Sequence, residues 1–187
     1  MILFVNACVR AGHSRTLRLA NVLLKRLNEP FTELVLSDIT FQPVDYSYIQ
    51  TRDLLLSEGD YMHPMFDLAR QFAAADEIVM AAPYWDLLFP AAVRAYFEAV
   101  TVSGITFRYD EHGIPHGLCR AKHFTFVTTA GGPIIGNFGF AYAEALCRGF
   151  YGIETVRCIS AEGLDIVGAD VPAILAEAKK GIVSAGK

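Results

Sequence analysis

The sequence predicts a doubly wound α/β fold, in which five parallel strands in the order 2-1-3-4-5 form one sheet with helices on both faces. Two observations predict this fold. Short apolar runs alternate with segments of helical spacing from one end of the chain to the other. One of those runs, 78–82, contains no polar residue, which is typical of a parallel strand that is covered on both faces. Because 187 residues suffice for one core and are few for two, we expect a single domain over 1–187.

The composition excludes some classes of binding partner and indicates the cellular compartment. The chain is 53% hydrophobic and 19% charged, with a net charge of −4 and basic residues scattered along it, so nucleic acid and anionic membranes are not expected as partners. No apolar run reaches the ~20 residues that span a bilayer, and residues 1–5 lack the charged leader of a secretory signal. The four cysteines show neither zinc-ligand nor disulfide spacing. We therefore expect reduced thiols, no metal site and a cytoplasmic protein.

The first strand and helix are marked by apolar residues and by a capping residue. Residues 2–5 form the first expected strand. Leu17, Ala20 and Leu24 then recur at helical spacing and give the following helix an apolar stripe. Ser14 precedes this stripe and is a favourable N-cap residue, so we expect the helix to begin near it.

The second strand is followed by a stretch without a clear period. Residues 32–36 form the expected strand. In residues 40–60, prolines, tyrosines and glycine interrupt any repeat, and we expect a long loop with one helical turn there. Such a loop borders a pocket or packs on the surface, and the sequence does not separate the two. A helix is expected over 64–75, before the apolar strand at 78–82.

The second half of the chain continues the alternation. Val93 and Phe97 recur at helical spacing after Pro90, which suits a first helical turn because its missing N–H costs nothing there. The remaining elements are a turn-rich loop over 105–118, a strand over 122–128, a helix over 140–150, a strand over 155–160 and a helix that opens at Asp170.

In this strand order the carboxyl ends of strands one, three and four meet at one crevice, where doubly wound folds bind ligands. The loop after the first strand leads into a helix N-terminus, where free backbone N–H groups and the helix dipole favour an anion. Ser14 and Thr16 add hydroxyl groups, and Arg10, His13 and Arg15 add positive charge or donors. This loop therefore suits a phosphate group. The alternative is a capped helix with solvated arginines.

The loops after the third and fourth strands suit a flat ring. Prolines stiffen the stretch that carries Tyr84 and Trp85, and this aromatic pair offers a wall for a planar ligand or, alternatively, closes the end of the core. Gly131 and Gly132 end the fourth strand and let backbone N–H groups approach a ligand closely. A phosphate joined to a flat ring with polar edges describes a mononucleotide flavin.

Five stretches then match the motifs of a known family, namely Ser14-Arg15-Thr16, Ala82-Pro83-Tyr84-Trp85, Gly104-Ile105-Thr106-Phe107-Arg108-Tyr109, Thr128-Thr129-Ala130-Gly131-Gly132 and Ala161-Glu162-Gly163. Over nearly its whole length the chain resembles the FMN-dependent NAD(P)H:quinone oxidoreductase and azoreductase family of flavodoxin-like proteins. The string that begins at Gly104 is the most specific of the five, and the glycine pair is the least.

The resemblance implies FMN as the cofactor, NADH or NADPH as the electron donor and a quinone or azo compound as the acceptor. It also implies a homodimer with the flavin pocket at the subunit interface. From this we expect a ping-pong reaction. By position, the phosphate and ribityl chain would lie among Cys8, Ser14, Arg15 and Thr16, and the ring would lie against Pro83, Tyr84, Trp85, Asp86 and Leu87. The pyrimidine edge would meet the loop of Thr128, Thr129, Ala130, Gly131 and Gly132, whose last four residues would supply donors.

Three features depart from the family pattern. Cys8 stands where a serine is common, and a thiol is the weaker hydrogen-bonding group. Asp86 stands where a neutral side chain is common, and a carboxylate near the ring would disfavour the reduced anionic flavin. Residues 133–138 lack the Tyr and His that assist hydride transfer in mammalian quinone reductases. The sequence therefore assigns no catalytic acid or base.

Two other functions fit a fold of this class. The first is a flavodoxin-like electron carrier that binds FMN without NAD(P)H turnover, although such carriers are usually more acidic than this chain. The second is a flavin-free phospho-receiver module, which would need acidic residues after the first strand, where this chain has Asn6-Ala7-Cys8. In the loop at 105–118, Tyr109, His112 and His116 either overhang the substrate or are solvated.

Overall fold

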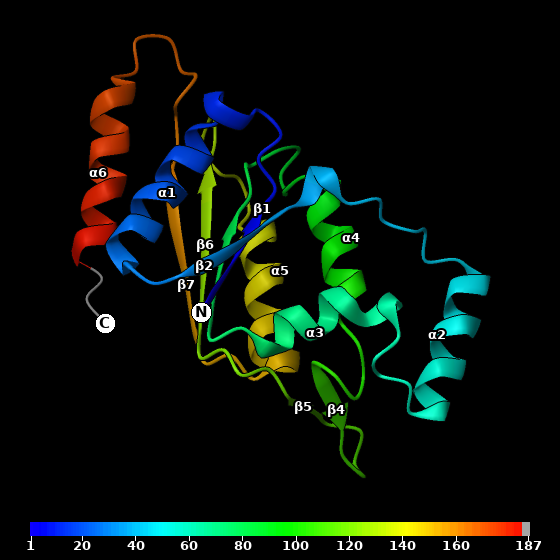
Figure 1. The fold of residues 1–187 in the computed structure, drawn as a ribbon. Helices are drawn as coiled ribbons and strands as arrows, with labels where there is room; N and C mark the ends of the chain where they lie inside the picture. Colours follow the sequence, from blue (N-terminus) through cyan, green and yellow to red (C-terminus); the bar gives the residue numbers. More distant parts are fainter. Residues whose placement is uncertain (185–187) are drawn as a thin grey trace.

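The sheet has the predicted strand order. In the computed structural model, which describes residues 1–184, five strands form one sheet in the order β2-β1-β3-β6-β7, and every neighbouring pair is parallel (Figure 1). The strands are β1 (Ile2–Asn6), β2 (Phe31–Val35), β3 (Glu77–Ala81), β6 (His123–Thr129) and β7 (Thr155–Ala161). Since β6 and β7 are the fourth and fifth strands of the sheet, the order 2-1-3-4-5 is confirmed. The expected domain over 1–187 includes residues 185–187, which lie outside the described residues.

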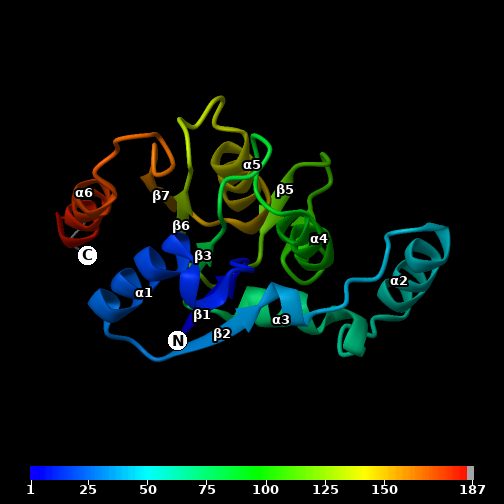
Figure 2. The same cartoon turned by 90° about the horizontal axis from the view of Figure 1, so that it is seen from above.

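Helices cover both faces of the sheet, as Figure 2 shows from above. The helices are α1 (Arg15–Leu27), α2 (Tyr46–Glu58), α3 (Asp67–Ala74), α4 (Ala91–Val100), α5 (Phe138–Leu146) and α6 (Val171–Ser184). Short 3₁₀ turns are η1 (Ala11–His13), η2 (Leu36–Asp38) and η3 (Pro64–Phe66), and η4 (Cys147–Tyr151) is a π-helical turn that continues α5. Helices α1 and α6 cover one face, and α3, α4 and α5 cover the other. Within residues 1–184, no helix combines the length and apolar character that crossing a bilayer requires.

The packing of β3 explains the uninterrupted apolar run at 78–82. Successive side chains of a strand point to opposite faces of the sheet. Ile78 and Met80 are fully buried in the cluster under α3, α4 and α5, whereas Val79 and Ala81 are fully buried in the cluster under α1 and α6. Both faces of the strand are therefore core.

Two helix starts that the sequence marks with a capping residue or a proline are present, one of them shifted. The Ser14 Oγ accepts the N–H of Leu17 at 3.1 Å, so Ser14 is the N-cap of α1 as predicted. Pro90, expected in the first turn of its helix, is instead the N-cap of α4, where its carbonyl accepts the N–H of Val93 at 2.9 Å.

The prediction of one helical turn within 40–60 was wrong, because this segment contains the thirteen-residue helix α2. Asp45 caps its start by accepting the N–H of Tyr48 at 2.8 Å, and Gly59 ends it with a φ of 73°. No residue of α2 is buried. Its apolar residues therefore do not form the core-facing stripe by which a helix is recognised in a sequence. Leu55 and Leu56 attach it to a small cluster under η3, and the helix otherwise stands away from the sheet (Figure 1).

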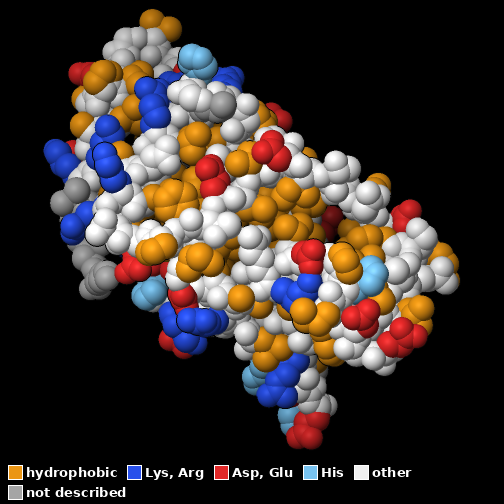
Figure 3. All heavy atoms as spheres, in the orientation of Figure 1, with side chains coloured by type: hydrophobic (Ala, Val, Ile, Leu, Met, Phe, Trp, Pro, Cys, Tyr) orange, Lys and Arg blue, Asp and Glu red, His pale blue; other side chains and the backbone are white. Residues whose placement is uncertain are grey.

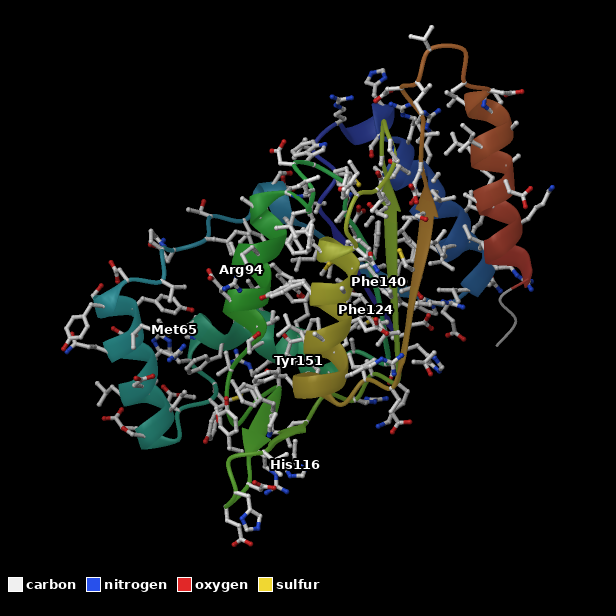
Figure 4. The ribbon with its side chains drawn as sticks, turned by 180° about the vertical axis from the view of Figure 1, so that it is seen from behind. Met65, Arg94, His116, Phe124, Phe140 and Tyr151 are labelled. Carbon is white, nitrogen blue, oxygen red and sulfur yellow. The ribbon has the colours of Figure 1, made fainter. Side chains whose placement is uncertain are left out.

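The loop expected over 105–118 is a two-stranded hairpin, because β4 (Phe107–Tyr109) pairs antiparallel with β5 (Pro115–Gly117). Strands of three residues are too short to show alternation in the sequence. The hairpin lies at the amino end of the sheet, opposite the carboxyl ends of the strands (Figure 1), and Figure 4 shows His116 at that end. The side chains of this hairpin therefore do not overhang the crevice of their own chain.

The hairpin meets η4 through two glycines. A Cβ atom on Gly117 would lie 2.1 Å from the backbone nitrogen of Gly152, a distance at which no side chain fits. Gly152 ends the π-helical turn with a φ of 74°, a conformation that favours glycine. The backbones of the hairpin and of η4 can approach this closely only because both residues lack a side chain.

Candidate functional site

The loops after β1, β3 and β6 meet in one cleft of about 250 Å³ at the carboxyl edge of the sheet. Ten of the fourteen predicted site residues line it, namely Cys8, Ser14, Arg15, Thr16, Pro83, Tyr84, Trp85, Thr129, Ala130 and Gly131. The other four, Asp86, Leu87, Thr128 and Gly132, do not line it. Strand order thus brings together residues that are more than a hundred positions apart.

The start of α1 forms one end of the cleft. The N-cap Ser14 accepts the N–H of Leu17. The N–H groups of Arg15 and Thr16 belong to the first turn, which has no intrahelical acceptor for them, and no hydrogen bond among the described residues uses them. The hydroxyl groups of Thr16 and Thr129 lie 2.6 Å apart and join the first loop to the third. Free donors and the positive end of the helix dipole make this end suitable for an anion.

Cys8 lies in the floor of the cleft and is buried. Its N–H donates to the Asn6 Oδ1 at 2.9 Å, and its Sγ lies 3.7 Å from the carbonyl oxygen of Ala81. Burial raises the pKa of the Cys8 thiol, although a hydrogen bond with Ser14 opposes the shift. The group is therefore a protonated thiol at neutral pH, which makes it a poor nucleophile.

Tyr84 and Trp85 form the other end of the cleft. The N–H of Tyr84 donates to the carbonyl of Thr129 at 3.0 Å, which extends the pairing of β3 with β6 beyond the strands. The Tyr84 hydroxyl donates to the carbonyl of Ile135 at 2.9 Å and accepts the N–H of the same residue at 3.1 Å. The Glu162 Oε2 accepts the N–H of Ile134 at 2.8 Å. These contacts hold the loop after β6 in place, and Trp85 remains 38% exposed beside it.

Asp86 and Leu87 form a tight turn. Trp85 and Leu88 exchange two backbone hydrogen bonds, of 3.2 and 2.8 Å, across this turn. Asp86 has a φ of 49° and Leu87 a φ of 69°, so two consecutive residues other than glycine adopt the left-handed conformation. Asp tolerates this conformation, whereas Leu is strained in it. In one chain these two residues shape the loop and do not line the cleft.

Thr128 and Gly132 lie outside the cleft for different reasons. The side chain of Thr128 points to the opposite face of the sheet from Thr129, because neighbours in a strand alternate. It lines a second cavity of about 380 Å³, which it shares with Tyr84. A Cβ atom on Gly132 would meet nothing within 4 Å, whereas one on Gly131 would lie 2.3 Å from the Asp165 Oδ2. Gly131 is thus packed closely against Asp165, whereas Gly132 faces open space.

Leu164 and Asp165 come after β7 and line the cleft, and they were not predicted from the sequence. The guanidinium group of Arg15 donates to the Leu164 carbonyl at 2.7 Å and to the Asp165 Oδ1 at 2.5 Å. One signal could have found this segment. In the predicted order the fifth strand lies beside the fourth, so the loop after it reaches the same edge of the sheet.

Comparisons with known proteins agree with this architecture. A family described as having the flavodoxin-like fold matches residues 1–185. An FMN-dependent NADH:quinone oxidoreductase of Clostridium beijerinckii is 32% identical over 193 residues, which cover 95% of this chain and 93% of that protein. These matches confirm the resemblance that the motifs indicate.

Solved structures show the same fold. A crystal structure of an azoreductase from Bacillus anthracis strain Sterne has a TM-score of 0.83 at 22% identity, over 97% of this chain and 95% of its own. An FMN-dependent NADH-azoreductase from Bacillus anthracis strain Ames Ancestor, solved in complex with FMN, has a TM-score of 0.80 at 21% identity, over 97% and 94% of the two chains. At these identities the likeness concerns the fold.

Proposed function

Because the chain belongs to the flavodoxin-like fold family, and within it to the FMN-dependent NADH:quinone oxidoreductases, we propose that it uses FMN and NADH to reduce a quinone or an azo compound. The observation that carries this proposal is the cleft itself. It places free helix-terminal N–H groups at one end and the aromatic pair Tyr84 and Trp85 at the other.

The residues of the cleft fit FMN. We assign the phosphate to the N–H groups of Arg15 and Thr16, and the ring system to the segment from Pro83 to Trp85. We assign the pyrimidine edge to the loop that contains Ala130 and Gly131, which also line the cleft. When bound, FMN supplies a ring that accepts a hydride and passes two electrons on.

The protein's own groups orient the ligand and set the local charge. The hydrogen bond between Thr16 and Thr129 fixes the distance between the phosphate end and the third loop. Arg10 and His13 also line the phosphate end, where positive charge favours an anion. The protonated thiol of Cys8 adds no negative charge to the floor. The carboxylate of Asp86, expected beside the ring, belongs to a residue that does not line the cleft.

A visible absorption spectrum of the purified protein tests the proposal. We expect flavin bands at one FMN per chain, either as purified or after incubation with FMN, and we expect NADH to bleach them under anaerobic conditions. A protein that remains colourless after incubation with FMN contradicts the proposal. If the protein were an electron carrier without NADH turnover, its flavin would be present and would stay oxidised after mixing with NADH.

We further propose that NADH and the acceptor occupy the same place in turn, which is a ping-pong mechanism. The support is the size of the site, because the cleft has only about 250 Å³ of space. Initial rates measured against both substrates are then expected to give parallel lines in double-reciprocal plots. Intersecting lines would mean that both substrates bind together.

We also propose that the protein is a homodimer whose partner completes the cleft. Ligand pockets usually enclose roughly 300–1,000 Å³, and the cleft of one chain is smaller. Five exposed apolar residues, Val9, Trp85, Leu87, Ile135 and Phe138, lie on the loops at its mouth or directly beside them, and we call this set the apolar rim. Hydrophobic side chains also gather across the middle of the face between α1 and α2 (Figure 3). Exposed patches of this kind mark protein interfaces.

Replacement of Ile135 by Asp tests the homodimer. We expect the unmodified protein to have twice the 20.5 kDa of one chain by light scattering, and the variant to shift toward one chain and to bind FMN more weakly. Val167, which is fully exposed in the loop before α6, provides the control variant Val167→Asp. A single-chain mass for the unmodified protein contradicts the proposal.

The four cysteines are free thiols, of which Cys158 is exposed. Free thiols persist in a reducing compartment, and NADH is available there, so we propose a cytoplasmic location.

A further inference from the structure

An ion pair crosses the mouth of the cleft. Arg15, at the start of α1, and Asp165, after β7, both line the cleft, and their side chains meet at 2.5 Å. Arg15 is 24% exposed and Asp165 is 65% exposed. An acidic group therefore contacts the arginine that stands beside the free N–H groups of the helix terminus. Among the described residues that line the cleft, Asp165 is the one with a carboxylate.

The backbone holds Asp165 in this position. Its N–H donates to the carbonyl of Gly131 at 2.8 Å, and the N–H of Leu164 donates to the carbonyl of Ala130 at 3.2 Å. The Asp165 Oδ2 lies so close to Gly131 that a Cβ atom there would be 2.3 Å from it. The carboxylate thus covers the glycine of the third loop and reaches the arginine of the first.

Arg15 has a second contact besides this carboxylate. Its guanidinium group also donates to the Leu164 carbonyl at 2.7 Å, and an arginine has five N–H donors in all. Loss of the negative charge at Asp165 would leave that backbone contact in place. The main effect of the carboxylate on an anionic ligand is therefore electrostatic, because two negative groups within a few ångström repel each other.

We propose that Asp165 is an internal competitor of the ligand's phosphate group. In the ligand-free protein it occupies Arg15, and it lowers the affinity of the cleft for a phosphate-bearing flavin relative to the same flavin without phosphate. This inference rests on the proposed function, since it takes FMN as the ligand. It makes Asp165 a specificity-determining residue for the phosphate end of the site.

The test compares FMN with riboflavin, which lacks the phosphate, in fluorescence titrations of flavin-free protein. Asp165→Asn keeps the shape of the side chain and removes its charge. We expect it to raise the affinity for FMN about tenfold, a change of the size that one partly screened charge can cause, and to leave riboflavin binding within about twofold. Asp165→Ser is expected to act in the same direction. The FMN effect should shrink between about 0.05 and 0.5 M salt because salt screens exposed charges.

Glu111→Gln is the matched control, since it removes one exposed negative charge from the turn between β4 and β5, at the end of the sheet opposite the cleft. The control is expected to change FMN affinity less than about twofold. The proposal is overturned if Asp165→Asn weakens FMN binding or changes FMN and riboflavin equally while the unmodified protein still binds FMN. An unmodified protein that binds neither flavin overturns the proposed function as well.

Discussion

Two buried tyrosines pack on the ring of Phe72 and differ in how their hydroxyl groups are satisfied. The Tyr151 hydroxyl lies 2.6 Å from the Thr101 Oγ1, whereas the Tyr96 hydroxyl is fully buried and has no hydrogen-bond partner among the described residues. Burial raises the pKa of both groups well above the ordinary value, so both stay neutral. A buried hydroxyl without a partner costs about 1–3 kcal/mol.

We therefore predict that removal of the hydroxyl group changes the free energy of unfolding in opposite directions at the two positions. Tyr96→Phe should raise the free energy of unfolding by about 1 kcal/mol, because it removes an unsatisfied group, and Tyr151→Phe should lower it by about 1 kcal/mol, because it removes a hydrogen bond. Urea denaturation followed by circular dichroism measures both. Equal destabilisation by the two substitutions would show that the Tyr96 hydroxyl has a partner after all.

Leu87 is a second residue whose conformation lowers the free energy of unfolding. At a φ of 69° an L-amino acid with a side chain is strained, and glycine is not. Leu87→Gly should therefore raise the free energy of unfolding by about 1 kcal/mol. Asp86→Gly should gain less, because aspartate tolerates this conformation. Thermal unfolding of both variants measures the difference, and a lower midpoint for Leu87→Gly would mean that its side chain contributes more to packing than its backbone costs.

Among the elements, α2 is the one that depends most on its caps. It has no buried residue, so little packing offsets the loss of a hydrogen bond at its end. The N–H of Tyr48, followed by the hydroxyl of Ser47, lowers the pKa of Asp45 below its ordinary value. A carboxylate with a lowered pKa stabilises the folded form above its unfolded pKa, and this contribution is lost as the pH falls through the folded value.

We predict that Asp45→Ala speeds amide hydrogen exchange in α2 and leaves exchange in β3 unchanged. In the unmodified protein, exchange in α2 should accelerate relative to β3 as the pH falls from the ordinary aspartate pKa of about 3.9 toward the lowered pKa of the folded cap. Mass spectrometry of exchanged peptides separates the two elements. Asp53→Asn is the control, because Asp53 lies on the same helix and pairs with Arg52 and not with the helix terminus. The same acceleration in the control would indicate a charge effect and not a capping effect.

The way in which an element is buried decides whether the sequence could predict it. Strand β3 is covered on both faces and reads as one apolar run, so its type and position were predictable. Helix α2 has no buried face, and the strands of the hairpin have three residues each, so neither leaves a periodic pattern. Periodicity reports contact with the core, and these elements lie largely outside it.

For the whole molecule, stability should depend on the two clusters that meet at β3. Met80 is fully buried in one of them, and its replacement by Ala removes packed atoms that no neighbour can replace. Met80→Ala should lower the free energy of unfolding by about 2–5 kcal/mol. Leu54→Ala, on the exposed side of α2, should change it by less than about 0.5 kcal/mol. Denaturant titrations compare the two, and similar losses would mean that α2 is part of the core.

The candidate site was largely predictable at this scale because strand order decides which loops meet. Strand order predicted that the loops Cys8 to Thr16, Pro83 to Leu87 and Thr128 to Gly132 meet, and residues of all three line the cleft. Leu164 and Asp165 were not predicted, since a single acidic residue in a turn carries no pattern of its own. Asp86 and Leu87 were assigned to the ring from their position in a motif, and only the backbone angles show that they form a turn.

Because Gly117 contacts Gly152 closely, substitutions at these two positions should be tolerated as poorly as substitutions in the hydrophobic core. Gly117 is exposed to solvent, yet every replacement there would push the hairpin away from the end of α5, because even one methyl group collides with the backbone. In a saturation mutagenesis experiment scored by protein abundance, Gly117 should reject all nineteen alternatives and Gly152 most of them, while the neighbouring His116 should accept most substitutions.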